Sequence, residues 1–282
     1  IINGTGNFIL TEMRDKGREF ADVLAEAQRL GYAEADPTFD VEGIDAAHKL
    51  TILASIAFGI PLQFERAYTE GITRVTREDV GYAEELGYRI KHLGIARRRK
   101  DGIELRVHPT LIPERRLIAN VDGVMNAVLV KGDAVGPTLF YGAGAGAEPT
   151  ASAVIADLVE VTRALTSDPD NRVPHLAFQP DAMADLPVLP IDRITTAYYL
   201  RLLAVDRPGV LADVTRILGD RGISIEALLQ KEPAEDATDV PVIILTHRVQ
   251  ESAMNEAIAA IEALETIAQP VVRLRVEHLD GN

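Results

Sequence analysis

The chain has 282 residues, and its 43 acidic against 29 basic side chains give a formal net charge of −14. This length accommodates two domains, and the 47% hydrophobic and 26% charged residues exclude an intrinsically disordered chain. The acidic balance argues against non-specific nucleic-acid binding, which needs a basic surface.

Two further absences in the sequence narrow the class of protein. Cysteine is absent, which excludes a disulfide framework, a thiolate nucleophile and a cysteine zinc site. The longest apolar run, residues 50–64, is interrupted by polar residues, glycine and proline, and it is too short to cross a bilayer. No cationic stretch leads into an apolar signal segment. We therefore expect a cytoplasmic protein without membrane or nucleic-acid partners.

Two helices are predicted in the first 60 residues. In residues 16–30 apolar side chains recur at three- and four-residue spacing, and Gly31 is a C-terminal stop signal. A second helix is predicted over residues 44–58 and ends before Pro61. Between the two helices lies an acidic stretch with glycine and proline, residues 32–43.

Alternating apolar and polar residues predict strands farther along the chain. The basic run at residues 97–100 precedes a turn and is expected to be a solvated loop tip, with a phosphate contact as the alternative. Residues 101–111 have the pattern of a half-buried strand. Residues 124–130 and 135–141 flank a Lys-Gly-Asp turn and are predicted to form a hairpin. A helix is predicted over residues 150–165, and its apolar content indicates burial on more than one side.

The remainder of the chain predicts an extended connector and then a small α/β unit. Residues 167–197 carry five prolines among aspartate and asparagine, which is typical of an extended segment. The apolar residues of this connector indicate that it lies against a surface. From residue 198 on, the predicted order is strand, helix, two strands, helix and strand. This βαββαβ order is typical of a ferredoxin-like fold.

The richest cluster of chemically capable residues is the segment 34–49, where five carboxylates precede one lysine. Asp45 and Lys49 are four residues apart at the start of the second predicted helix, so they share a face. An ordinary surface ion pair, worth about 0.3–0.5 kcal/mol, accounts for this spacing. The alternative is a lysine that donates a proton to a carbonyl oxygen, beside acids that hold an ammonium group.

No metal site is predicted. The acidic segment superficially resembles a calcium loop, but Pro37 follows the first acid, Val41 stands where a glycine is needed, and the closing glutamate is missing. The six histidines are scattered without a metal-ligand spacing.

Three glycines, Gly142, Gly144 and Gly146, stand between a predicted strand and a predicted helix. Glycine permits close approach of a ligand to the backbone, and a helix N-terminus favours an anionic group. Their spacing is not the dinucleotide fingerprint G-x-G-x-x-G, and a tight packing turn is the alternative.

At these residues the sequence resembles the catalytic domain of the homoserine dehydrogenase family. The resemblance is carried by Asn-Gly-Thr-Gly-Asn-Phe-Ile-Leu at residues 3–10, by residues 27–49, and by the glycine-rich loop with Pro-Thr-Ala-Ser-Ala-Val at residues 149–154. The C-terminal unit resembles an ACT domain, through Asp-Arg-Pro-Gly-Val-Leu at residues 206–211 and Gly-Ile-Ser-Ile at residues 222–225.

The fold implied by the resemblance is α+β, with a mixed-sheet catalytic domain that carries helices on one face, followed by the ferredoxin-like ACT domain. The implied parts are a catalytic, substrate and dimerisation domain at residues 1–143, a loop and helix at 144–166 that return to a nucleotide-binding domain, the connector at 167–195, and the ACT regulatory domain at 196–282. The family's N-terminal Rossmann domain is missing, so we expect the chain to be a fragment of a longer protein.

The resemblance implies NAD- or NADP-dependent interconversion of L-aspartate 4-semialdehyde and L-homoserine, on the route to threonine, isoleucine and methionine. Lys49 is then the proton donor or acceptor at the substrate oxygen, and Asp45 lies beside it and orients substrate or water. Glu34 binds the substrate's amino group. The other implied positions are Asp40, Tyr32, Gly4 and Thr5 in the substrate site and Gly142, Gly144 and Gly146 near the cofactor.

The ACT resemblance implies regulation by a small amino acid, with threonine as the expected effector, in a homodimer or homotetramer. The implied effector positions are Asp206, Pro208, Gly209, Val210, Leu211, Ile223, Ser224 and Ile225. Gly209 permits close backbone approach, and the helix that follows favours a carboxylate at its N-terminus. A purely structural dimerisation domain is the alternative for this unit. For the whole chain, the alternative is a non-catalytic amino-acid sensor with a degenerate enzyme core.

Overall fold

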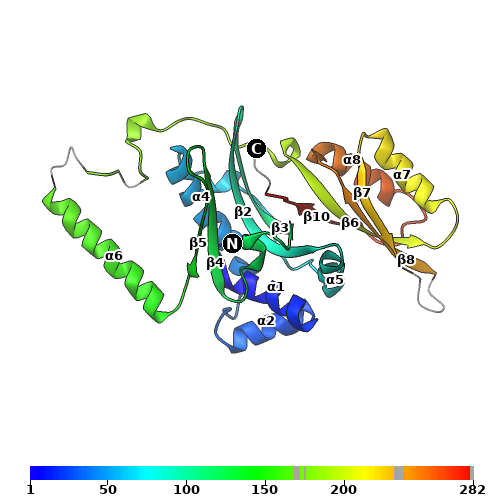
Figure 1. Cartoon of the computed structure of the whole chain (residues 1–282), viewed down its shortest axis with the longest axis horizontal. Coiled ribbons are helices and arrows are strands. Elements are labelled where there is room, and N and C mark those ends of the chain that lie inside the picture. Colours follow the sequence, from blue (N-terminus) through cyan, green and yellow to red (C-terminus); the bar gives the residue numbers. More distant parts are fainter. Residues whose placement is uncertain (168–171, 175, 232–237, 280–282) are drawn as a thin grey trace. The chain divides into compact units, whose positions relative to one another are not determined.

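The computed structural model describes residues 1–167, 172–174, 176–231 and 238–279 (Figure 1). The chain divides into two compact units, each described by itself below. Unit 1 comprises Ile1–Arg77, Lys91–His108 and Leu117–Leu189, and unit 2 comprises Glu78–Ile90, Pro109–Arg116 and Pro190–Asn282. Two strands, β2 (Tyr88–Arg99) and β3 (Gly102–Pro113), contribute residues to both units.

The helices of unit 1 are α1 (Gly4–Lys16), α2 (Phe20–Arg29), α3 (Thr38–Val41), α4 (Ile44–Phe58) and α6 (Ala147–Thr166), with short 3-10 turns at Phe64–Arg66, Leu117–Asn120 and Pro180–Ala182. The predicted helix over residues 44–58 is confirmed. The one over residues 16–30 begins later, at Phe20, because Gly17 adopts a left-handed conformation with φ of 59° and ends α1.

The core of unit 1 forms where α4 packs on β3. Ala46, Ala47, Leu50 and Ala54 on one side of α4 meet alternate residues of the strand, Ile103, Leu105 and Val107. The connector lies against the same core, because Ile103 N–H donates to the Pro187 carbonyl at 2.9 Å and Ile103 O accepts from Leu189 N–H at 2.8 Å. The prediction that the connector lies against a surface is therefore confirmed; its residues 168–171 and 175 lie outside the described residues.

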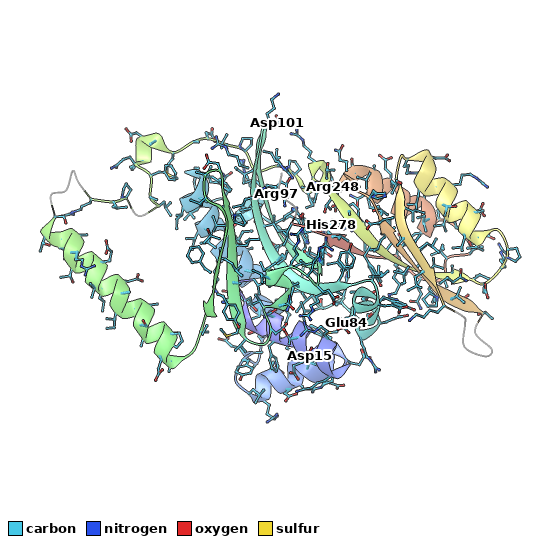
Figure 2. All side chains as sticks on the ribbon, in the orientation of Figure 1. Asp15, Glu84, Arg97, Asp101, Arg248 and His278 are labelled. Atoms are coloured by element: carbon cyan, nitrogen blue, oxygen red, sulfur yellow. The ribbon has the colours of Figure 1, made fainter. Side chains whose placement is uncertain are left out.

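The remaining strands of unit 1 form short pairs. β1 (Tyr68–Thr69) runs parallel to β3, and the predicted hairpin is confirmed as β4 (Met125–Gly132) antiparallel to β5 (Gly136–Ala143). The basic run at residues 97–100, expected as a solvated loop tip, lies mostly on β2. Figure 2 shows Arg97 on this strand and Asp101 at the turn into β3. Arg97 and Arg99 each pair with buried Glu104 of β3, at 3.6 and 2.5 Å.

Helix α6 has no buried residue, and in Figure 1 it lies apart from the hairpin that precedes it. The prediction that it is buried on more than one side is wrong within this chain. The helix is apolar as predicted, but its large apolar side chains are exposed, among them Val154, Ile155, Leu158, Val161 and Leu165.

Polar contacts hold helix α1 against its neighbours. Neither this helix nor these contacts were predicted from the sequence. Asn7 Nδ2 donates to the carbonyls of Val121, Gly123 and Met125 at 2.9, 3.0 and 3.1 Å. Buried Lys91 donates to Asn7 Oδ1 at 3.2 Å and to Asp122 Oδ1 at 3.0 Å. Burial raises the pKa of Asp122, but hydrogen bonds from Arg14 and Lys91 outweigh it and lower that pKa to about 2.

Unit 2 has the predicted ferredoxin-like order. Its elements are β6 (Thr195–Val205), α7 (Val210–Asp220), β7 (Ile225–Gln230), β8 (Asp239–Thr246), α8 (Glu251–Glu262) and β10 (Val272–Val276), with the two-residue β9 (Val249–Gln250) and a 3-10 turn at Ile191–Arg193. The strand order is β3-β10-β6-β8-β7; residues 110–111 of β3 pair in parallel with residues 275–276 of β10, and the other neighbours are antiparallel. Apolar residues of β6 and β8 and of helices α7 and α8 form its core.

Two adjacent tyrosines of β6 bind buried carboxylates that come from different helices. Tyr198 Oη donates to Glu251 of α8 at 2.7 Å. Tyr199 Oη donates to Asp79 of α5 (Arg77–Glu85) at 3.1 Å, and Arg201 Nε donates to the same carboxylate at 2.7 Å. Successive side chains of a strand point to opposite faces of its sheet. Helix α5, which was not predicted from the sequence, therefore lies on the face of the sheet opposite α8.

A buried histidine lies under the first turn of α4. His92 is 5% exposed, its Nε2 donates to the Glu70 carbonyl at 2.9 Å, and among the described residues its Nδ1 has no hydrogen-bond partner. Burial lowers the pKa of His92 to about 4, although the bond to Glu70 works in the opposite direction. The folded chain therefore holds this ring neutral.

We expect His92 to make stability depend on pH between about 6.5 and 4. In this window the unfolded chain binds a proton that the folded chain does not, so the free energy of unfolding falls as the pH falls, by about 3 kcal/mol in all. Urea unfolding of the protein and of His92→Gln at several pH values measures the effect. The glutamine keeps a donor for the Glu70 carbonyl but cannot titrate. Parallel losses of stability in the two proteins would show that other groups are responsible.

Candidate functional site

The candidate site forms where α1 and α4 begin. Gly43 precedes α4 with φ of 79°, and a Cβ at this position would lie 2.9 Å from His92 Cε1 and 3.0 Å from Val107 Cγ1. Only glycine combines this conformation with so little space. The sharp turn brings Asp40, at the end of α3, close to Asp45, in the first turn of α4.

The predicted pair of Lys49 and Asp45 is formed. Lys49 Nζ donates to Asp45 Oδ2 at 2.7 Å and to the carbonyl of Ile2 at 3.2 Å. The two side chains are 49% and 26% exposed, so the ammonium group is held on one side and open to a ligand on the other. The contact with Ile2 comes from outside the helix, which a simple intrahelical ion pair does not require.

Asp40 belongs to the same cluster through a residue that was not assigned a role from the sequence. Asn3 Nδ2 donates to Asp40 Oδ1 at 2.7 Å and to Asp45 Oδ2 at 3.0 Å. Asn3 stands in the motif that carries the resemblance, directly before Gly-Thr-Gly at residues 4–6. Its identity as an N-cap residue was the signal available in the sequence.

Three other predicted residues lie on the neighbouring turn and the start of α1. Thr5 Oγ1 donates to the Tyr32 carbonyl at 2.5 Å, and the half-exposed Tyr32 ring packs edge-on against Phe8 with centroids 5.1 Å apart. A Cβ on Gly4 would lie 2.9 Å from the Val124 carbonyl oxygen. The backbone of α1 therefore sits tightly against its neighbours.

Glu34 is held by its backbone alone. Gln28 Nε2 donates to the carbonyl of Glu34 at 3.0 Å and to that of Ala35 at 3.2 Å. The Glu34 side chain is exposed, and its carboxylate forms no hydrogen bond or ion pair with any described residue. The structure thus leaves this carboxylate available to a cationic group and does not join it to the cluster of Lys49, Asp45 and Asp40.

Glycine is present at the three positions of the loop before α6 for different structural reasons. A Cβ on Gly144 would overlap Asn126, with 1.8 Å to Nδ2, and Gly146 has φ of 117°. Packing and backbone conformation therefore account for these two. The space beside Gly142 is open, which fits a ligand that approaches the backbone there.

Among the residues that the structure describes, no group of three or more histidine, aspartate or glutamate side chains is placed to hold a metal ion. Nor does any helix in the described part of the chain have the length and hydrophobicity needed to cross a membrane.

Unit 2 contains a separate hollow of about 310 Å³ at one end of its sheet. It is lined by the loop between β6 and α7 together with Gln230, Val240 and Val242. Five predicted effector positions line it, namely Asp206, Pro208, Gly209, Val210 and Leu211. Gly209 precedes α7 with φ of 97°, so the N-terminus of that helix begins at the hollow.

The other three predicted effector positions do not line this hollow. Ile223 N–H donates to the Leu218 carbonyl at 3.0 Å, and the carbonyl of Ser224 accepts from His247 N–H at 2.8 Å. Ile225 pairs with Thr246 at one end of β7, whereas Gln230 is at the other end. Within one copy of the chain, the two predicted groups are separated by the length of this strand.

Comparison with known proteins gives two family matches. The homoserine dehydrogenase family matches residues 1–159, and the ACT domain matches residues 198–266. A homoserine dehydrogenase of Pseudomonas aeruginosa is 72% identical over 280 residues, which is 99% of this chain and 64% of that protein. One from Neisseria gonorrhoeae is 58% identical over 279 residues, with the same coverage of 99% and 64%. The chain therefore spans about 64% of the length of these curated relatives.

Solved structures give the same result. The crystal structure of a homoserine dehydrogenase from Thiobacillus denitrificans matches with a TM-score of 0.94 and 73% identity, over 99% of this chain and 63% of that one. A homoserine dehydrogenase from S. aureus matches with a TM-score of 0.73 and 31% identity, over 99% of this chain and 64% of that one. The α+β architecture with a C-terminal ferredoxin-like unit is thus shared with both.

Proposed function

This chain belongs to the homoserine dehydrogenase family, and from this premise we propose that it provides the catalytic and regulatory parts of an NAD- or NADP-dependent oxidoreductase. The proposed reaction is the reversible reduction of L-aspartate 4-semialdehyde to L-homoserine, in the biosynthesis of threonine, methionine and isoleucine. The observation that supports it most is the Lys49–Asp45 contact of 2.7 Å, with the ammonium group still open to a ligand. A cytoplasmic, homo-oligomeric enzyme is part of the proposal, and the exposed apolar residues of the β4–β5 hairpin support self-association.

The chemistry needs a hydride at the carbonyl carbon and a proton at the carbonyl oxygen. A bound nicotinamide supplies the hydride. Lys49 Nζ donates the proton as negative charge develops on the oxygen, and in the reverse direction it accepts the hydroxyl proton of homoserine. Asp45 holds Nζ in place through their hydrogen bond of 2.7 Å.

The other residues bind and orient the substrate. The Glu34 carboxylate receives the substrate's ammonium group, since it is exposed and forms no bond with a described residue. Asp40, Tyr32, Gly4 and Thr5 form the surrounding wall. Gly142, beside open space, permits the cofactor to approach, and Gly144 and Gly146 shape the same loop.

The test is a turnover assay with the longest protein that carries this chain. L-homoserine is supplied with either NAD or NADP, and formation of the reduced nucleotide is followed by absorbance. Comparison of the two nucleotides measures the cofactor preference. 4-Hydroxybutyrate, which lacks the amino group, is the matched control because it cannot bind Glu34. A folded protein that turns over homoserine with neither nucleotide would refute the proposal and favour the non-catalytic sensor.

We expect L-threonine to bind in the hollow of unit 2. Gln230→Ala should weaken its affinity about fivefold, since one neutral hydrogen bond contributes about 1 kcal/mol. Titration calorimetry with threonine, isoleucine and methionine on the whole protein measures this. Glu226→Ala is the control, because Glu226 is an exposed residue of the same strand that does not line the hollow. Three flat titrations would favour a purely structural unit, and equal effects of both variants would place the effector elsewhere.

A further inference from the structure

A single carboxamide joins the residues of the Lys49 cluster. Asn3 is 8% exposed, its Oδ1 accepts the N–H of Gly6 at 2.8 Å, and its Nδ2 donates to Asp40 at 2.7 Å and to Asp45 at 3.0 Å. The oxygen caps α1, and the two hydrogens of the nitrogen serve one carboxylate each. Every polar atom of this side chain is therefore used by the chain itself.

The chemistry of the position requires an amide. Two carboxylates that lie this close repel each other unless a donor stands between them. Aspartate has the shape of asparagine but carries no hydrogen to donate, and it would bring a third carboxylate into the cluster. Serine caps a helix as well as asparagine does, yet it is too short and has too few hydrogens to reach both acids.

The contact also determines where Lys49 is held. Asp45 Oδ2 accepts from both Asn3 Nδ2 and Lys49 Nζ, at 3.0 and 2.7 Å. Asn3 thus limits rotation of the carboxylate, and the carboxylate in turn fixes the ammonium group. The carbonyl of Ile2, directly before Asn3, accepts from the same Nζ at 3.2 Å. One short segment therefore orients the lysine from two sides.

We propose that Asn3 is a positioning residue for the proton transfer at Lys49. Asn3 acts through Asp45 and does not itself touch the reacting atoms. The inference rests on the proposed function. If it holds, loss of the amide leaves Lys49 present but misdirected. Misplacement of a reacting group by about 1 Å lowers the rate by about 100-fold, so kcat falls much more than KM rises.

The experiment separates positioning from helix capping by comparing Asn3→Ser, Asn3→Asp and Asn3→Ala in the longest protein that carries this chain. Serine and aspartate keep the cap, so any change in thermal unfolding of the serine variant reports the lost contacts with Asp40 and Asp45 and not a lost cap. We expect kcat to fall about 10- to 100-fold in all three variants, with KM changed less than about threefold. If only capping matters, the serine and aspartate variants will keep normal kcat and the alanine variant alone will be impaired.

A second readout does not depend on turnover. In a crystal structure of Asn3→Ser, the Asp45 carboxylate is expected in more than one rotamer, because its second donor is gone. A single unchanged Asp45 rotamer, or normal kcat in the serine and aspartate variants of an active protein, would overturn the role of Asn3. Absence of turnover in the unsubstituted protein would instead overturn the proposed function, and the rotamer would still decide the role of Asn3.

Discussion

Replacement of Lys49 by methionine is expected to lower kcat by about two to four orders of magnitude, the range that general acid–base catalysis contributes. Methionine keeps the length and most of the volume of the side chain but has no proton to donate. The side chain of Lys49 is 49% exposed, so its loss should leave the free energy of unfolding nearly unchanged. Steady-state turnover of homoserine and urea unfolding of the same preparations measure both effects.

Lys100→Met is the matched control for this variant. Lys100 is an exposed lysine in the turn between β2 and β3, so the same substitution removes a charge without touching the Lys49 cluster. It should leave kcat unchanged. Near-normal turnover by Lys49→Met would exclude this lysine as the proton donor, and equal losses in both variants would point to a general effect of charge.

Removal of the Asp79 carboxylate is expected to have the largest effect on stability, about 3–5 kcal/mol in the free energy of unfolding. Asp79 is fully buried and accepts hydrogen bonds from Tyr199 at 3.1 Å and from Arg201 at 2.7 Å. Asp79→Ala therefore leaves a largely buried guanidinium and a buried hydroxyl without this acceptor. Urea unfolding followed by circular dichroism measures the loss.

The neighbouring residue provides the control. Glu78 pairs with the same Arg201 at 3.2 Å, but its side chain is 47% exposed. Exposed ion pairs contribute about 0–1 kcal/mol, so Glu78→Ala should cost no more than that. Similar losses for the two variants would show that burial of Asp79 is not what makes this contact important.

Local pattern was sufficient for much of the fold. Helix α4, the position of strand β3, the β4–β5 hairpin and the βαββαβ order of unit 2 follow from periodicity and turn residues, and the structure confirms them. The prediction that β3 is only half-buried is wrong, because both of its faces are buried and its polar residues Glu104 and Arg106 pair with each other at 3.2 Å. Helices α1 and α5 were missed because the faces they bury are partly polar, with Asn7 and Thr11 on α1 and Asp79 on α5. A polar residue becomes a core residue only when its hydrogen-bond partners arrive from elsewhere in the chain.

Helix α6 and strand β2 both show that composition alone does not predict the burial and contacts of a segment. The apolar content of α6 predicted burial, yet none of its residues is buried. The basic run at the end of β2 predicted a solvated tip, and residues 98–100 are exposed, but Arg97 and Arg99 also pair with buried Glu104. The composition of a segment indicates whether it favours burial or solvent exposure, but the segments that pack against it determine which of the two occurs.

For the candidate site, the sequence by itself determined the pairing of Asp45 with Lys49, because a spacing of four residues places two side chains on one face of any helix. Only the tertiary structure decided that Asn3 links Asp45 to Asp40 and that the Ile2 carbonyl also holds Lys49. These partners are separated by about forty residues of chain, and they meet only when residues 2–3 fold against the first turns of α4 and the end of α3. Local spacing does not determine which residues meet over such a separation.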